Sequence, residues 1–483
     1  MDRIIGVETE FGPAVWNKNK KEFDKDSMSM QFLVSSLGSA NQFLENGARV
    51  YLDAGDHIET ATPECLSARE AALYDKALEQ KIAGIINGFN AGFMSKKKDC
   101  KFILFKNNAD FSGHSHGCHE NYLVPNYLWE AIAIYPTHPV SRFFQLFLAA
   151  RQILCGSGFI SRGMRFHFSQ RTAFIQATIS QSSTGMRAII HQKNESLMLD
   201  MASRLHILVA DSNMSNWSAY LRLGTAHLAL LALEETMAQG RQSMGNHLFY
   251  HELDCVRLFR DINSDIGLTK KYPISKNCFV SVIDIHCMMI EYIEKTIGKI
   301  LSKNEREILN YWEKFIEKIK QKDEDFLSCR LDWAIKKRLL ESKLEKEGVN
   351  PIRLTKQISE NAFVSERLAS QMQALDLWYH DISRAGIFNQ IFARGSIAPL
   401  FSESEIEIAK DFPPKTRAAW RGNAIRYFNK TLRYTPDFRF RHECWTKFGI
   451  ESMRNDAEPR IFINYDPYNG NWDEVRDFID HIC

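Results

Sequence analysis

The sequence predicts a protein of mixed α and β structure, with an open sheet in the first half of the chain, helices in the second half and a small module at the end. Strand-like segments with one polar face alternate with helical segments up to about residue 211. The pattern is helical from about residue 217 to 390. Because Pro413 and Pro414 follow an acidic helical segment, we expect a large domain at 1–410 and a small one at 411–483.

Five segments of the first half are expected to be strands. Each combines β-branched or aromatic residues with a polarity that alternates every second residue. Their sequences are RIIGVETEF (3–11), ARVYLDAG (48–55), FILFKNN (102–108), MRFHFSQR (164–171) and RLHILVAD (204–211). Several carry polar side chains on one face, namely Arg49, Tyr51 and Asp53, His167 and Ser169, and Arg204 and His206. A sheet with one packed and one charged face favours an open catalytic platform over a buried parallel sheet.

Two long segments carry clear helix signals. The first, AREAALYDKALEQKIAGIINGF (68–89), separates strands of the first half. The second, SKNEREILNYWEKFIEKIKQK (302–322), begins with a capping box from Ser302 to Glu305. Its apolar stripe consists of Ile308, Trp312, Phe315 and Ile319. We expect this stripe to face the core and the charged residues around it to face solvent.

The composition of the chain limits the cellular compartment and the classes of binding partner that we expect. The chain has 61 basic and 59 acidic side chains, a near balance that gives no sign of a nucleic-acid partner. No apolar run approaches the roughly 18 residues that a membrane helix needs, so we expect no membrane partner. The ten cysteines form no CxxC pair and no zinc-type spacing, which favours a reduced, cytoplasmic setting.

The first strand places two carboxylates, Glu8 and Glu10, side by side on one face. Neighbouring carboxylates repel and raise each other's pKa unless a cation lies between them, and Mg²⁺ favours carboxylate ligands together with phosphate oxygens and water. For Glu8 alone, a salt-bridged glutamate at a rim is the alternative. Polar groups from two further segments favour the metal site, namely Tyr51 and Glu59 in NGARVYLDAGDHIETATPEC (46–65), and His119 and Glu120 in KNNADFSGHSHGCHENYLV (106–124).

No glycine-rich phosphate loop of the GxxxxGK[ST] or GxGxxG type lies where a strand meets a helix. If ATP is bound, a metal ion and arginines must therefore hold its phosphates. The candidates are Arg49, Arg187, Arg204 and Arg222. For each arginine taken singly, the alternative is a surface ion pair.

Several long motifs together resemble the Pup ligase and depupylase family, relatives of glutamine synthetase and glutamate–cysteine ligase. They occur in order from residue 3 to about 450. They comprise the segments at 46–65 and 106–124 given above, and also GVETEFG, SRLHILVADSNMS, RLDWAIKKRLL, LDLWYHDI and PPKTRAAWRG. The resemblance implies an α+β, glutamine synthetase-like fold, in which a curved antiparallel sheet cradles the active site and helices back it. It also implies that the small C-terminal domain contributes to the nucleotide site.

The resemblance implies roles for particular residues of this chain. Mg²⁺ ligands are implied at Glu8, Tyr51 and Glu59. Asp53 is implied to be the catalytic group. Contacts with ATP are implied for Arg49, Thr62 and Trp445.

Further candidates are less directly matched. His119 and Glu120 resemble a His-Glu pair that lines nucleotide or metal sites in this superfamily, with a core histidine as the alternative. Glu10 would be a second metal ligand or a support for the first, with a structural arginine partner as the alternative. Arg204 and His206, on the polar face of their strand, complete the set.

Two features favour the ligase branch over the depupylase branch. The motif reads YLDAGDH, and residues 13–45 are too few to hold the extra loop of depupylases. The resemblance then implies an enzyme that activates the C-terminal glutamate of a Pup-like modifier with ATP and joins it to lysine amines of substrate proteins by an isopeptide bond. Because HQKNESLML (191–199) departs from the family pattern near the substrate groove, the modifier itself stays open.

Three alternatives remain at this point. The first is a depupylase or deamidase in which Asp53 acts as nucleophile or activates water. The second is an ATP-dependent ligase of a small amino acid or peptide. The third, a binding protein without activity, is disfavoured because Glu8, Tyr51, Asp53 and Glu59 are all present.

Overall fold

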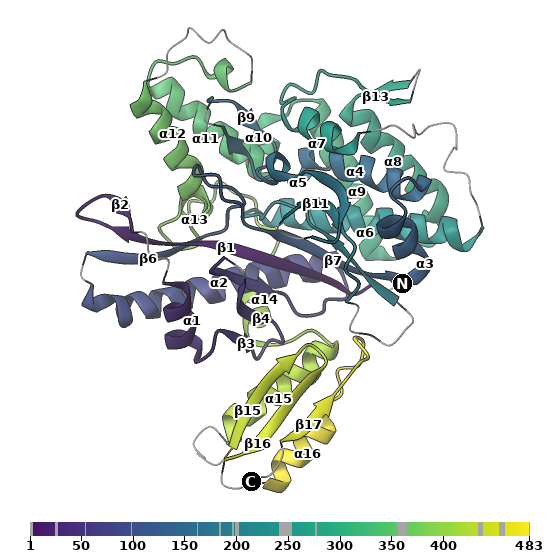
Figure 1. Cartoon of the computed structure of the whole chain (residues 1–483). Coiled ribbons are helices and arrows are strands. Elements are labelled where there is room, and N and C mark those ends of the chain that lie inside the picture. Colours follow the sequence, from purple (N-terminus) through teal and green to yellow (C-terminus); the bar gives the residue numbers. More distant parts are fainter. Residues whose placement is uncertain are drawn as a thin grey trace.

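We describe the fold from a computed structural model of the chain. It describes residues 3–24, 28–53, 55–97, 99–161, 163–182, 185–195, 198, 202–240, 254–275, 278–355, 365–432, 438–453 and 459–482. A large body built on one sheet carries a small C-terminal domain that projects from one side (Figure 1).

The main sheet is built around one long strand, β1 (Ile5–Asn17). The strand order is β10-β11-β12-β7-β1-β5-β4-β3, and β2 and β6 pair with the second half of β1. Their bounds are β2 (Glu22–Phe23), β3 (Asn41–Phe43), β4 (Arg49–Asp53), β5 (His57–Ala61), β6 (Cys100–Phe105), β7 (Cys118–Pro125), β10 (Ala177–Ser180), β11 (Ala188–His191) and β12 (Ala202–Ile207). Only β10 and β11 pair in parallel within this order. The expected α+β fold with an antiparallel sheet is therefore confirmed.

Alternation along the strands separates a packed face from a polar face. In β1, Ile5 and Val7 are buried in the main core, whereas Glu8 and Glu10 lie on the opposite face. Residues directly opposite each other in an antiparallel pair share a face. The polar face of β1 therefore continues across its neighbours on both sides.

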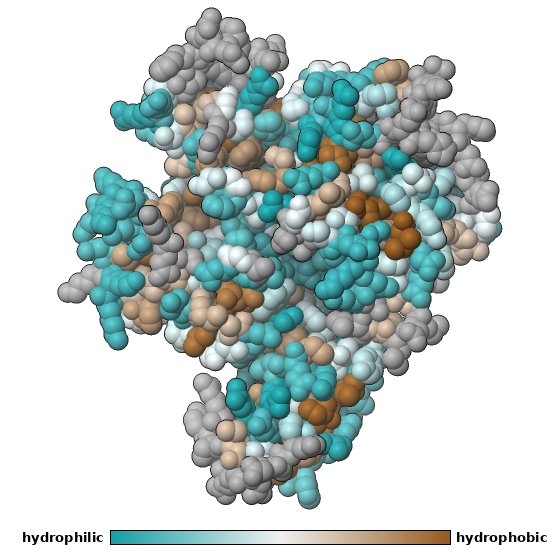
Figure 2. Space-filling model, in the orientation of Figure 1, coloured by the Kyte–Doolittle hydropathy of each residue, from teal (hydrophilic) through white to brown (hydrophobic). Residues whose placement is uncertain are grey.

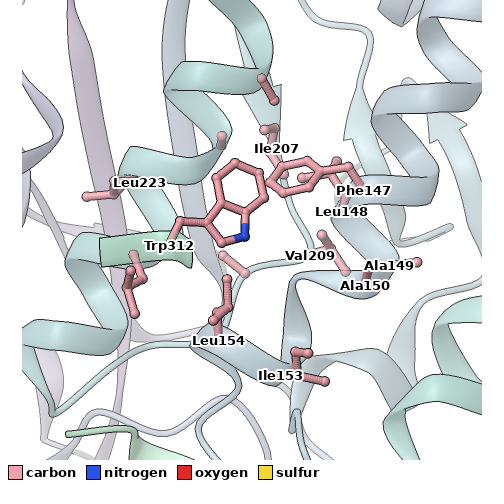
Figure 3. Packing of buried hydrophobic residues seen from close by; sticks show 14 of the residues in the cluster. Phe147, Leu148, Ala149, Ala150, Ile153, Leu154, Ile207, Val209, Leu223 and Trp312 are labelled. Carbon is pink, nitrogen blue, oxygen red and sulfur yellow. The ribbon is translucent and has the colours of Figure 1, made fainter. Parts of the chain in front are cut away.

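Helices cover the packed face. They include α2 (Ala68–Ala91), α4 (Pro139–Ala150), α6 (Asn216–Ala238), α8 (Val282–Ile297) and α9 (Lys303–Lys320). In the core between them, the rings of Trp312 and Phe147 lie 5.4 Å apart, with Leu223 and Ile207 close by (Figure 3). The indole nitrogen of Trp312 donates a hydrogen bond of 3.0 Å to His286, so this buried polar atom is satisfied.

The expected helix at 302–322 is confirmed as α9. It begins with the predicted capping box, in which the Ser302 side chain accepts from the Glu305 amide and Glu305 reaches back to the Ser302 amide. All members of the predicted stripe are buried, namely Ile308, Trp312, Phe315 and Ile319. The segment at 68–89 is likewise helical within α2.

Shorter elements complete the large body. The helices are α1 (Ser29–Leu37), η1 (Phe93–Lys96), α3 (Asn126–Trp129), η2 (Glu130–Ile134), α5 (Gln152–Cys155), η3 (Arg171–Phe174), α7 (Cys255–Asn263), α10 (Glu324–Leu327), α11 (Asp332–Lys346), η4 (Pro351–Leu354), α12 (Glu366–Tyr379), α13 (Ile387–Ala393) and α14 (Glu403–Asp411). The remaining strands form two hairpins, β8 (Phe159–Ile160) with β9 (Phe166–His167), and β13 (Tyr272–Ser275) with β14 (Cys278–Val280).

One of the five expected strands is wrong over most of its length. In segment 164–171 only β9 is a strand, and a turn of 3-10 helix, η3, begins at Arg171. The reason is a buried carboxylate: Asp211 accepts hydrogen bonds from the amides of Gln170 and Arg171 and from the Ser169 hydroxyl. These groups therefore bond to a side chain instead of a neighbouring strand. The other four segments lie on β1, β4, β6 and β12.

The C-terminal domain has its own core. It consists of α15 (Arg417–Thr431), β15 (Phe438–Cys444), β16 (Lys447–Ser452), β17 (Arg460–Ile463) and α16 (Asp473–Ile482). Apolar side chains of its helices and strands pack together, namely Trp420, Phe448, Phe462, Val475 and Ile479. The small C-terminal domain is confirmed, while its exact start at residue 411 stays a prediction.

The surface is mostly hydrophilic on the face shown in Figure 2, where apolar side chains form small groups among polar ones. Among the helices that the structure describes, none is both long enough and apolar enough to cross a membrane.

Candidate active site

A broad cavity of about 660 Å³ lies over the polar face of the sheet. It is lined by side chains of β1, β4, β5, β7 and β12 and by one residue of the C-terminal domain. It brings together most of the predicted site residues, namely Glu8, Glu10, Arg49, Tyr51, Asp53, Glu59, His119, Arg187, Arg204, His206 and Trp445. Thr62, Glu120 and Arg222 are the exceptions.

Strand register explains why the acidic groups meet. Glu10 of β1 lies opposite Glu59 of β5, and Glu59 lies opposite Tyr51 of β4. One row of the sheet therefore presents two carboxylates and a phenol to the cavity. Asp53 is two residues further along β4 on the same face, and carboxylate oxygens of Glu10, Asp53 and Glu59 lie within 4.8 Å of one another.

This acidic row has more negative charge than its surroundings balance. Burial, with the neighbouring carboxylates Glu8 and Glu10, raises the pKa of Glu59 well above its usual range. Burial and the charge of Glu59 likewise raise the pKa of Tyr51. Binding of a cation between these oxygens would remove the repulsion.

Glu8 lies in a second group of possible ligands. Its carboxylate is 3.2 Å from Nδ1 of His119 and 3.3 Å from Nε2 of His206. Burial lowers the pKa of His206 to about 4, so this imidazole is neutral at pH 7 and able to bind a metal. Arg204 lies 3.4 Å from Glu8 on the other side.

Glu10 has a histidine partner. Nδ1 of His57 lies 3.2 Å from the Glu10 carboxylate. Although burial opposes it, the hydrogen bond from His57 lowers the pKa of Glu10 to about 2. The arginine partner that we considered for Glu10 is therefore not what the structure shows, since the ion pair of this carboxylate within the described part of the chain is with His57.

A smaller cavity of about 110 Å³ adjoins the first one. Thr62, Glu64 and Arg417 line it, and Glu8, Arg204 and Trp445 line both cavities. The Thr62 hydroxyl accepts a hydrogen bond of 3.0 Å from the amide of Val7, so Thr62 is fixed at the inner end of β1.

Aromatic and basic side chains stand where the two cavities meet. The Trp445 ring packs edge-on against Phe43 at 5.1 Å, and the Arg421 guanidinium lies 4.8 Å from the Trp445 ring. The Arg49 guanidinium lies 4.3 Å from the Tyr51 ring and donates to Asn41. These contacts hold Arg49 and Trp445 at the edge of the carboxylate group.

Two sequence-based candidates line neither cavity. Glu120 is wrong as a site residue, because it is fully buried on the packed face of β7 and forms two hydrogen bonds, of 2.7 and 2.9 Å, with Arg151. Arg222 is also directed into the core, where it donates to Cys118 and to the carbonyl of Asp211. Both side chains therefore serve packing of the sheet against its helices.

Sequence reasoning missed several residues that line the large cavity, among them Arg171 and His57. The sequence predicts a strand at Arg171, and nothing in the neighbouring residues indicates that its buried guanidinium lines a cavity. His57 lies in the quoted motif, and its pairing with Asp53 across β4 and β5 could have been read from the short GD turn between them.

The chain is similar to proteins of one family over nearly its whole length. The family model described as "Pup-ligase protein" matches residues 3–439. The "Pup--protein ligase" of Acidimicrobium ferrooxidans is 32% identical over 480 residues, 96% of each chain. That of Kineococcus radiotolerans is 30% identical over 495 residues, 99% of each chain.

Two solved structures resemble the chain. In a complex of the prokaryotic ubiquitin-like protein Pup with its ligase PafA, the matched chain is 25% identical, with a TM-score of 0.81 over 100% of this chain and 91% of that one. The Pup ligase PafA in complex with ADP is 25% identical, with a TM-score of 0.73 over 93% of this chain and 92% of that one.

Proposed function

Because the chain belongs to the Pup-ligase family, we propose that it is an ATP-dependent ligase that joins the C-terminal glutamate of a Pup-like modifier to lysine amines of substrate proteins. One observation carries the proposal: Glu8, Tyr51 and Glu59 line a single cavity together with Asp53. The side chains that the chemistry requires thus come from three separate strands and meet on one face of the sheet.

The acidic row fits Mg²⁺. Hard carboxylate and phenol oxygens are the donors present, and a cation bound between them would relieve the repulsion by which Glu8 and Glu10, together with burial, raise the pKa of Glu59. Glu8, Tyr51 and Glu59 would hold the ion, with Glu10 beside them. When bound, Mg²⁺ would supply charge neutralisation for the phosphate oxygens during transfer.

The nucleotide fits the end of the cleft near the C-terminal domain. We assign the base to the smaller cavity, where Thr62 and Trp445 lie, and the phosphates to the large cavity beside Arg49. Glu8 and Trp445 line both cavities, so a nucleotide can extend from the smaller cavity into the large one. This supports the assignment of the base to one and the phosphates to the other. An aromatic ring at their junction offers a stacking surface for a base.

The first chemical step makes the glutamate reactive. A carboxylate is a poor electrophile, so an oxygen of the glutamate side chain attacks the γ-phosphorus of ATP, ADP leaves, and an acyl phosphate forms. Catalysis of such a transfer rests on positioning and charge stabilisation. Arg49 is placed to stabilise the charge that develops on the phosphate oxygens.

The second step is attack by a lysine amine. With a pKa near 10.4, only about one lysine in 2,500 is neutral at pH 7, a cost of roughly 4.6 kcal/mol at about 1.36 kcal/mol per pKa unit. Asp53 lies on the same strand face as Tyr51 and is placed to attract the ammonium and accept its proton. The nitrogen then attacks the acyl carbon, phosphate leaves, and an isopeptide bond forms.

The relatives favour this function over the alternatives. The curated relatives that match nearly the whole chain bear the name of a Pup ligase, and nothing in the cleft specifically favours a hydrolase or a ligase of small amino acids. We place the reaction in the cytoplasm, which is supported by the free thiols of the described cysteines.

A product-resolved assay tests the proposal. The protein is given Mg²⁺-ATP and a glutamate-ending Pup peptide, with and without a lysine-bearing acceptor, while ADP release and product masses are measured. We expect one ADP per isopeptide adduct. Loss of the tag from a pre-made conjugate without stoichiometric ADP would instead assign the chain to the hydrolases.

A further inference from the structure

Two imidazoles and a carboxylate meet beside the acidic row. They belong to Glu10 of β1, to His57 at the start of β5, and to His116, which lies two residues before β7. One possible ligand atom of each group lies within 4.8 Å of those of the other two. The proposed reaction uses neither imidazole, so their presence at this place needs a separate explanation.

The distances within this set are close to those around a metal ion. Nδ1 of His57 lies 3.2 Å from Oε2 of Glu10, and the ring centroids of His57 and His116 are 4.5 Å apart. Two ligand atoms of a tetrahedral ion, each about 2.0 to 2.1 Å from it, lie roughly 3.4 Å apart. Glu10 and His57 already have this spacing, and a rotation of the His116 ring is enough to complete the set.

The His116 imidazole is buried and its position is fixed by the backbone. His116 is 7% exposed, and within the part of the chain that the structure describes its Nδ1 has no hydrogen-bond partner. Its amide donates to the Asn108 carbonyl at 3.1 Å, and its carbonyl accepts from the Asn108 side chain at 3.0 Å. Buried polar atoms are almost always hydrogen-bonded, and a bound ion or water can account for an exception.

Gly12 provides the space for this imidazole. It follows Glu10 by two residues in β1 and therefore lies on the same face of the strand. A Cβ atom at Gly12 would lie 3.0 Å from Nε2 of His116, so any side chain would press on the ring. The strand thus places a carboxylate and a buried imidazole next to each other.

A second set of two histidines and a glutamate lies in the cleft, at Glu8, His119 and His206. It differs in charge, because the Arg204 guanidinium lies 3.4 Å from the Glu8 carboxylate. Among the described residues, no arginine or lysine forms an ion pair with Glu10. The negative charge of Glu10 is therefore the more available of the two for a cation.

We propose that Glu10, His57 and His116 form a binding site for a divalent transition-metal ion such as Zn²⁺, separate from the Mg²⁺ site of the acidic row. Mg²⁺ prefers oxygen ligands, whereas imidazole nitrogens suit Zn²⁺ and similar ions. Two histidines and one carboxylate leave coordination positions for water. Because Glu10 and His57 line the large cavity, an ion can reach the site from there.

The ion acts on the acidic row through Glu10. This carboxylate lies opposite Glu59 across β1 and β5, and its oxygens approach those of Asp53 and Glu59 within 4.8 Å. An ion held by both histidines fixes the Glu10 carboxylate and takes up its negative charge without entering the row. The site is therefore a support for the acidic row, a role beyond the reaction proposed above.

Zinc binding to the full chain tests the proposal without ATP or a modifier. Isothermal titration calorimetry measures Zn²⁺ affinity in excess Mg²⁺, which fills the sites made of oxygen ligands, and thermal unfolding is followed with and without Zn²⁺. The variants are His57→Gln, His116→Phe and His206→Gln, the last of which removes a ligand of the second set. His114→Gln is the matched control, because His114 is an exposed histidine of the same loop that pairs with Asp110.

We expect the wild type, His114→Gln and His206→Gln to share one zinc site of the same affinity. His57→Gln and His116→Phe should bind zinc at this site at least about tenfold more weakly, because loss of a residue that only supports a metal ligand already costs about 10 to 100-fold. Zinc should raise the unfolding midpoint of the wild type, since an ion that binds the folded chain stabilises it, and should raise it less in these two variants. Without zinc, His57→Gln should unfold like the wild type, because the His57 side chain is partly exposed.

Other results would overturn the inference. Unchanged zinc affinity in either folded variant, His57→Gln or His116→Phe, would exclude the site. Loss of the zinc site in His206→Gln alone would assign the ion to the set at Glu8, and absence of zinc binding to the wild type would refute both. If His116→Phe does not fold, His57→Gln alone decides. Because none of these outcomes involves ATP or a peptide, failure of this inference leaves the proposed function untouched.

Discussion

At the scale of single residues, Gly117 is a tightly constrained position of the cleft. A Cβ atom at this position would lie 2.5 Å from a Glu10 carboxylate oxygen and 2.7 Å from Nε2 of His119. Both of these side chains line the cavity, and the amide of Glu10 donates to the Gly117 carbonyl. Glycine is therefore needed here for space, because any side chain must displace a group of the acidic row.

Gly117→Ala should impair activity more than folding. We expect a loss of roughly tenfold or more in kcat/KM, because displacement of about 1 Å at a catalytic site can cost about a hundredfold. The measurement is ADP-coupled ligation together with thermal unfolding. Gly84→Ala on α2, where a Cβ atom would meet nothing within 4 Å, is the matched control and should keep full activity.

Asp53 is the second residue whose role is open to a direct test. Asp53→Asn keeps the size of the side chain but cannot accept a proton from the lysine ammonium. Because general-base catalysis is typically worth about 10² to 10⁴-fold, ligation should fall by that factor while ATP affinity is nearly unchanged. Single-turnover ligation and equilibrium binding of a fluorescent ATP analogue measure the two effects. Normal ligation by this variant would refute the assignment.

At the scale of elements, α9 shows how a local sequence signal becomes stability. Its Ser302 side chain caps the Glu305 amide, and the Glu305 carboxylate returns a bond to the Ser302 amide and pairs with His227 of α6 at 3.3 Å. The capping box thus also connects two helices of the core.

Ser302→Ala should destabilise the protein without affecting the cleft. Loss of an N-cap typically costs about 1 kcal/mol, so we expect the free energy of unfolding to fall by roughly 0.5 to 2 kcal/mol in a denaturant titration. Ser302→Asp retains a side-chain oxygen that accepts a hydrogen bond, so this variant should keep most of the free energy of unfolding that the alanine variant loses. An unchanged unfolding midpoint for the alanine variant would mean that the cap is not formed.

The elements also show what the sequence could and could not predict. Period-two alternation correctly placed Glu8 and Glu10 on one face of β1, since a strand repeats every two residues. The same rule excludes a shared face for His119 and Glu120, which are neighbours on β7, and the resemblance misled us there. The position of Arg171 depends on the hydrogen bond that its amide donates to Asp211, 40 residues later, and no local pattern reveals such a contact.

At the scale of the whole molecule, one buried ion-pair group joins the C-terminal domain to the sheet. Glu64 lies 2.9 Å from Arg417 and 2.8 Å from Arg421, both on α15. Arg421 also donates to the carbonyls of Gly47 and Trp445, at 2.7 and 2.8 Å. Glu64 follows Thr62 closely in the chain, so the same short segment lines the smaller cavity and anchors the domain that carries Trp445.

This anchor should respond to acid. Although burial opposes it, the charges of Arg421 and Arg417 lower the pKa of Glu64 to about 2. A carboxylate whose pKa falls on folding contributes stability that is fully present above its unfolded pKa, near 4.3, and is lost as the pH falls through the folded value. We therefore expect the C-terminal domain to loosen between about pH 4 and 2. Intrinsic tryptophan fluorescence of Trp445 and its neighbours follows this change.

Glu64→Gln tests whether the anchor sets nucleotide affinity. Removing the charge leaves two buried arginines without this carboxylate, and breaking a buried pair in this way typically costs about 3 to 5 kcal/mol. Because Trp445 is held through Arg421, we expect the KM for ATP to rise at least tenfold, while the KM for the modifier changes little. Glu474→Gln removes an exposed partner of Arg460 within the C-terminal domain and serves as the control. If both variants bind ATP like the wild type, the domain is held by its other contacts and Trp445 does not depend on this ion pair.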